Sequence, residues 1–131
     1  MPIKYTVEPE NFLVYCHLTG TVKLLDVKNN FLAYTAEPDF TKGMDIIIDT
    51  DESLLDLSNL DILELAGYML NNKPKRGYTY RIAMVVPDGS PNQKTAELYQ
   101  LNMSIHVRAV EIFKTLTRAR SWLTPNKTQF L

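Results

Sequence analysis

The sequence predicts an α/β fold with a single mixed, mostly parallel five-stranded sheet flanked by about four helices, in the order β-β-α-β-α-β-α-β-α. Short apolar strands alternate along the chain with longer segments that have helical spacing. The run Ile46-Ile47-Ile48 is typical of a strand buried on both faces at the centre of a parallel sheet. The length of 131 residues fits one domain, which we place at residues 1–124, with a C-terminal tail at 125–131.

Two strands begin the chain. In residues 3–8 apolar and polar side chains alternate, which indicates a strand with one buried face. Residues 12–18 are almost wholly apolar, as in a strand buried on both faces. The turn signal Pro9-Glu10-Asn11 between them predicts an antiparallel hairpin. We expect Thr19-Gly20-Thr21 to end the second strand.

The helices share an apolar stripe and recognisable end signals, and we place them at residues 23–36, from Ser58 to about 71, from Ser90 to about Met103, and after Thr115 or Thr117. Ser58 with Asp61 forms a near capping box, and Ser90 with Gln93 forms a complete one. Gly67 lies inside the second helix, where glycine costs about 1 kcal/mol relative to alanine. We therefore expect close packing against a neighbour, or room for a ligand, at that position.

Three further strands are expected at residues 44–49, 78–86 and 105–113. In the last of them His106 and Arg108 alternate with apolar residues, so one face is at least partly wet. This pattern predicts an edge strand or an uncovered face of the sheet.

The order of elements, together with several short motifs, resembles the STAS domain of bacterial anti-sigma-factor antagonists and, more closely, the SpoIIAA-like family. The motifs are Leu18-Thr19-Gly20-Thr21-Val22, Pro38-Asp39-Phe40, Asp45 to Asp49, Arg81-Ile82-Ala83-Met84-Val85-Val86, and Ile112-Phe113 with Ala119 and Trp122-Leu123. The resemblance covers residues 1–124 and implies a sheet flanked by helices, often in a homodimer. It also implies a kinship in architecture to lipid-exchange domains of the CRAL-TRIO type.

Composition excludes several classes of function. The net charge of −1 provides no excess of cations to neutralise phosphates, so we expect no nucleic-acid partner. The basic cluster Lys73, Lys75 and Arg76 is interpreted as favourable charge at a helix end. A single cysteine rules out an intrachain disulfide and argues against a cysteine-based zinc site. No apolar run is long enough for a transmembrane segment, and the N-terminus lacks an apolar signal core, so we predict a cytoplasmic protein without a cofactor.

The first functional hypothesis is a non-enzymatic binding or regulatory module. It is based on the many aromatic and methionine side chains. Such residues suit a crevice between helix and sheet that takes a small apolar or lipid-like ligand, or a protein partner. The residues we expect to line it are Tyr34, Phe40, Met44, Met69 and Tyr80.

The alternative hypothesis is a phosphorylation-controlled partner switch. Asp56-Leu57-Ser58-Asn59 matches the turn that carries the phosphorylated serine in anti-sigma-factor antagonists, but Leu57 stands where that first serine would be. Ser58 is the candidate phosphosite, because free N–H groups at a helix N-terminus stabilise a phosphate. An ordinary N-cap explains the same serine.

The enzyme hypothesis has Asp49, Asp51 and His17 as its candidates. The two aspartates fall at the carboxyl end of the central strand, where open α/β sheets place ligands. Cys16 and His17 are adjacent, but successive strand residues point to opposite faces, so they form no nucleophilic dyad. We assign no catalytic residue and no metal ligand.

Overall fold

The structure is a computed structural model that describes residues 2–124, and the expected tail at 125–131 lies outside the described residues. Its elements are β1 (Ile3–Glu8), the 3-10 turn η1 (Pro9–Asn11), β2 (Leu13–Val22), α1 (Leu24–Thr35), β3 (Asp45–Leu55), α2 (Asn59–Asn71), α3 (Lys73–Arg76), β4 (Arg81–Val85), α4 (Gln93–Met103), β5 (Ala109–Phe113) and α5 (Leu116–Leu123). The predicted α/β class and strand-helix order are confirmed, with the four-residue α3 as an additional helix.

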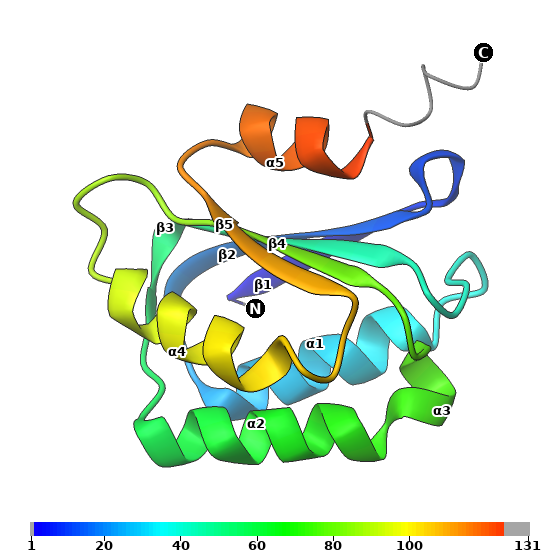
Figure 1. Ribbon diagram of the computed structural model, residues 1–131, viewed down its shortest axis with the longest axis horizontal. Helices are drawn as coiled ribbons and strands as arrows, with labels where there is room; N and C mark the ends of the chain where they lie inside the picture. Colours follow the sequence, from blue (N-terminus) through cyan, green and yellow to red (C-terminus); the bar gives the residue numbers. More distant parts are fainter. Residues whose placement is uncertain (1, 125–131) are drawn as a thin grey trace.

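The five strands lie in chain order, β1-β2-β3-β4-β5. Strand β1 is antiparallel to β2, and all other pairs are parallel. Right-handed crossovers between strands added in sequence put every connecting helix on the same side of a sheet. Accordingly α1, α2 and α4 cover one face, and α5 is the one element of residues 2–124 that lies over the other (Figure 1). Among the described strands the order never reverses, so this part of the sheet has no topological switch point.

Two apolar clusters of unequal size hold the layers together. The larger one lies between the sheet and the three crossover helices, and the smaller one lies beneath α5 around Leu13, Ala119 and Leu123. Ile46 belongs to the larger cluster and Ile47 to the smaller one, because neighbouring strand residues face opposite ways. The prediction that this isoleucine run forms the central, doubly buried strand is therefore confirmed.

The second strand is longer than expected. Thr19-Gly20-Thr21 does not end it, because β2 runs on to Val22 and stays paired with β3 as far as Leu55. The register shifts on the way: His17 pairs with Asp49, but Thr19 pairs with Glu52, so β3 carries one extra residue. Such a bulge changes the direction of the side chains beside it.

The fourth and fifth strands are shorter than expected, at five residues each. His106 and Arg108 precede β5, so the alternation of residues 105–108 was misread as strand. The His106 N–H donates to Met103 O, which is a turn at the end of α4. Strand β5 is nevertheless at the edge of the sheet, as predicted.

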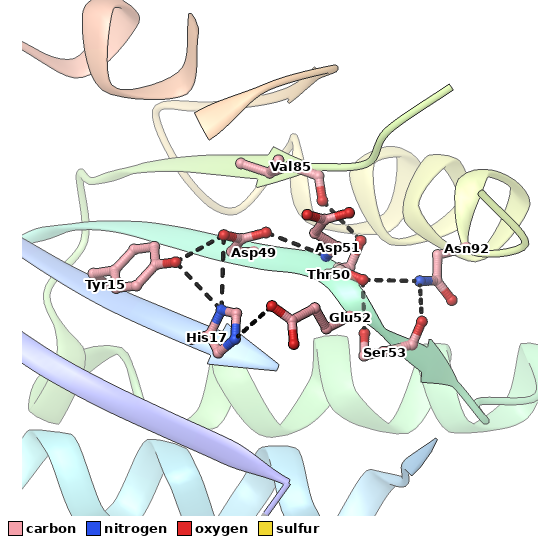
Figure 2. Close-up of polar contacts among 9 residues, drawn as sticks. All are labelled: Tyr15, His17, Asp49, Thr50, Asp51, Glu52, Ser53, Val85 and Asn92. Carbon is pink, nitrogen blue, oxygen red and sulfur yellow. Dashed lines mark hydrogen bonds and ion pairs between the residues drawn. The ribbon is translucent and has the colours of Figure 1, made fainter. Parts of the chain in front are cut away.

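The capping box predicted at Ser90 is wrong. The N-cap of α4 is Asn92, and the Ser90 hydroxyl accepts the Asn92 N–H instead of that of Gln93. The buried Asn92 side chain holds the far end of β3: its oxygen accepts the Leu55 N–H at 2.8 Å, and its amide donates to Ser53 O at 2.9 Å. Figure 2 shows this amide beside the bulged part of β3.

Other local expectations divide. The Ser58–Asp61 capping box and the Thr115 cap are both present. Gly67 is exposed, and a Cβ there would meet nothing within 4 Å, so the expected close packing is wrong. Lys73, Lys75 and Arg76 lie in the last turn of α3, so the charge is at a helix end as interpreted, but Arg76 is 1% exposed, which the sequence did not indicate. Within residues 2–124, no helix is long and apolar enough to cross a membrane.

Candidate functional site

Two small cavities lie between the sheet and the helical layer. Each has a volume of about 50 Å³, and Leu18, Val27, Ile48 and Tyr99 line both, so the two adjoin. The first extends towards Tyr34 and Tyr80, and the second extends towards Leu55, Leu57, Ile62, Leu65 and Met84. A water molecule needs roughly 10–15 Å³ of such space, so each cavity has room for several non-hydrogen atoms.

The structure places three of the five predicted crevice residues in the wall of the first cavity: Tyr34, Met69 and Tyr80. Phe40 packs edge-on against Tyr34, with ring centroids 5.6 Å apart, and Met44 is buried, but neither lines the cavities. Apolar spacing identified residues that face the core. It does not show where packing leaves space, because that depends on how side chains from four strands and three helices interlock.

One wall of the first cavity is polar. Asn30 in α1 is 9% exposed, and its amide nitrogen donates to the Cys16 sulfur at 3.3 Å. Its carbonyl oxygen has no hydrogen-bond partner among the described residues. Burial raises the pKa of the Cys16 thiol to about 11, so the thiol keeps its proton at neutral pH.

Arg76 lies directly behind the tyrosine end of this cavity. Its guanidinium carbon is 3.8 Å from the centroid of the Tyr80 ring, and its Nε–H donates to the Tyr34 hydroxyl at 2.9 Å. Both terminal nitrogens are buried and unpartnered within residues 2–124. Burial raises the pKa of the Tyr34 and Tyr80 hydroxyls, an effect that the charge of Arg76 partly offsets. The sequence did not indicate that Arg76 is buried, because its burial depends on three aromatic rings from other segments of the chain, those of Tyr34, Phe40 and Tyr80.

A second polar group lies on the opposite face of the sheet, at the bulge of β3 (Figure 2). The Tyr15 hydroxyl donates to Asp49 Oδ2 at 2.7 Å. His17 Nδ1 is 3.8 Å from that carboxylate oxygen, and His17 Nε2 is 3.7 Å from Glu52 Oε1. The extra residue in β3 brings both acids to His17. Cys16 faces the helical layer, so the exclusion of a Cys–His dyad is confirmed.

The enzyme candidates are thus only partly brought together. Asp49 and His17 are neighbours, whereas Asp51 contributes its backbone N–H to Asp49 Oδ1 at 3.2 Å and its side chain is exposed. Burial, and then the bond to Asp49, raises the pKa of the Tyr15 hydroxyl, so it acts as a donor that fixes Asp49. No group of three metal-ligating side chains occurs in the described part of the chain, and this cluster lines neither of the two cavities. The geometry supports a hydrogen-bonded connection between β2 and β3.

Ser58 is exposed at the N-terminus of α2. Its hydroxyl accepts the Asp61 N–H at 3.1 Å, and the Asp61 carboxylate accepts the Ser58 N–H at 2.9 Å. A phosphate at Ser58 would therefore stand beside a carboxylate of the same sign and replace a complete capping box. The arrangement is that of an N-cap.

No family model, no curated protein and no solved structure matches this chain. The resemblance to the SpoIIAA-like family accordingly stays a prediction.

Proposed function

We propose that this protein is a non-enzymatic binding module that holds a small, predominantly apolar ligand between its sheet and its helical layer. The supporting observation is the pair of adjoining cavities that meet at Leu18, Val27, Ile48 and Tyr99. Protein interiors are close-packed, and side chains around a void lose dispersion contacts that a ligand restores. A narrow apolar ligand lying across the junction would contact both cavities.

The binding experiment blocks the junction of the two cavities with a larger side chain from α1. Val27 lines both cavities, so Val27→Phe places a ring where the ligand would lie. We expect this variant to lose at least about tenfold in affinity for 1-hexanol, measured by chemical-shift titration of the methyl groups around the cavities. Leu25→Phe is the matched control, because Leu25 is 66% exposed on the same helix.

Two outcomes would contradict the proposal: no binding of hexanol or hexanoate to the unaltered protein, or equal affinities of the Val27→Phe and Leu25→Phe variants. Thermal unfolding of both variants controls for loss of the fold, since a ring forced into a packed core also destabilises it.

The predicted homodimer and the cytoplasmic location belong to the same proposal. A binding module of 131 residues gains a regulatory output when ligand occupancy changes how two copies pair. The exposed leucines of α2, Leu60, Leu63 and Leu70, support pairing of this kind.

A further inference from the structure

Arg76 is held inside the protein by its backbone. It ends the four-residue helix α3, and its carbonyl oxygen accepts the Gly43 N–H at 3.0 Å. The next residue, Gly77, packs closely on the loop that contains Gly43. A Cβ at Gly77 would lie 2.4 Å from the Gly43 nitrogen. Since both sides of this contact are main chain, the helix cannot rotate to bring the guanidinium into solvent without breaking it.

The guanidinium is enclosed by aromatic rings. Its central carbon is 3.8 Å from the centroid of Tyr80, 5.3 Å from that of Phe40 and 5.5 Å from that of Tyr34. Ring faces attract a cation, but they accept no strong hydrogen bond. The N–H groups of Nη1 and Nη2 are left without partners among residues 2–124, and no carboxylate of that part of the chain forms an ion pair with Arg76. Arginine stays charged at all ordinary pH values.

The cavity beside these rings has a second unpartnered polar group. Asn30 and the two tyrosines that contact Arg76 line the same cavity, and the Asn30 oxygen is unpaired. Rotation of the amide by 180° would let the Cys16 thiol donate to that oxygen and would free the Asn30 N–H groups. In that orientation Asn30 offers hydrogen-bond donors in the wall of the cavity. The unpartnered N–H groups of Arg76, which does not itself line the cavity, lie behind Tyr34 and Tyr80 at the same end.

We propose that the ligand of this cavity is an amphiphile with a carboxylate head, which pairs with Arg76 while its chain lies across the junction towards Leu57 and Met84. This inference rests on the proposed function and adds the class of ligand to it. A guanidinium offers two parallel N–H donors to a carboxylate, and the pair is neutral. A dianionic phosphate would leave one negative charge unpaired among apolar side chains, which is unfavourable.

The experiment compares hexanoate with 1-hexanol, which have the same chain and differ in head group, by chemical-shift titration of the full chain at neutral pH. We expect hexanoate to bind about tenfold more tightly than hexanol to the unaltered protein. Arg76→Met keeps the unbranched stem and removes the charge, and it should bind the two compounds about equally. Lys75→Met is the matched control, because Lys75 is an exposed neighbour in α3, and it should keep the preference.

Each result decides. Equal affinity for hexanoate and hexanol in the unaltered protein overturns the carboxylate inference and leaves the apolar cavity function standing. A preference that survives Arg76→Met overturns the role of Arg76. Absence of binding for both compounds overturns the proposed function as well. Hexyl phosphate is the third probe, and tighter binding of it than of hexanoate would replace the carboxylate by a phosphate head. If Arg76→Met does not fold, the hexanoate-to-hexanol ratio of the unaltered protein still decides.

Discussion

Cys16 is a buried thiol whose protonation is coupled to folding. Burial raises the pKa of this thiol from 9.0 to about 11, while the hydrogen bond from Asn30 and the charge of Arg76 act in the opposite direction. A raised pKa means that the folded state holds the proton more tightly than the unfolded chain. The resulting stability is fully present below pH 9 and is lost as the pH rises through 11.

The corresponding prediction concerns Cys16→Ala. The alanine variant lacks the titrating thiol, so the difference in unfolding free energy between it and the unaltered protein should shrink by on the order of 2–3 kcal/mol between pH 8 and pH 11. Urea unfolding at both pH values measures it. The buried tyrosines Tyr34 and Tyr99 also titrate at high pH, and a Cys16 thiolate raises their pKa, so their coupling to the thiol is part of the measured difference. A difference that is independent of pH would contradict the assigned burial of the thiol.

At the scale of a single element, two glycines behave in opposite ways. Gly67 lies on the exposed side of α2 with open space around it, whereas Gly77 has φ +107° and would place a Cβ against the backbone of Gly43. Gly67→Ala should therefore raise the unfolding free energy by about 0.5–1 kcal/mol, through helix propensity and a less flexible unfolded chain. Gly77→Ala should lower it by about 2–3 kcal/mol, because that backbone region is open to glycine alone.

Denaturant unfolding of both variants, at concentrations where the chain is monomeric, checks this pair of predictions. A destabilised Gly67→Ala would show that something in solution packs on that side of α2. An unaffected Gly77→Ala would show that the loop beside α3 can move, which would also weaken the argument that Arg76 is confined.

Elements with local determinants could be predicted from the sequence, and elements set by distant contacts could not. The Ser58–Asp61 box needs only one turn of helix, and the sequence shows it directly. At Ser90 the sequence favoured the same motif, but Asn92 is engaged by β3, 37 residues earlier, and the helix begins later. The bulge beside His17 and the burial of Arg76 likewise depend on partners far along the chain. The candidate site was therefore predictable as a helix-sheet crevice with tyrosines, but not as a cavity next to a buried cation.

The whole molecule has two unequal faces. Three crossover helices cover one face of the sheet, and the eight-residue α5 covers part of the other. Two arginines fix α5 in place: Arg81 from β4 donates to Leu123 O at 2.9 Å, and Arg120 forms two bonds to the Glu8 carboxylate of β1. Arg81 also pairs with Asp45, so the same guanidinium connects β3, β4 and the end of α5. The smaller core is thus bordered by charge pairs, and the larger core provides the space for a ligand.

The outer side of the helical layer carries the last prediction. Leu60, Leu63 and Leu70 of α2 are 76%, 55% and 42% exposed, and their spacing places them with Gly67 on one stripe of the helix. In a two-fold homodimer the stripe would meet its own copy, so each substitution acts twice.

We expect the protein to sediment as a dimer, and Leu63→Lys to shift it to a monomer by placing two buried like charges opposite each other. Leu101→Lys, at a leucine 71% exposed on α4, is the matched control and should stay dimeric. A monomeric unaltered protein at micromolar concentration would rule out this interface, and dissociation by both substitutions would show that the effect is charge rather than the α2 stripe.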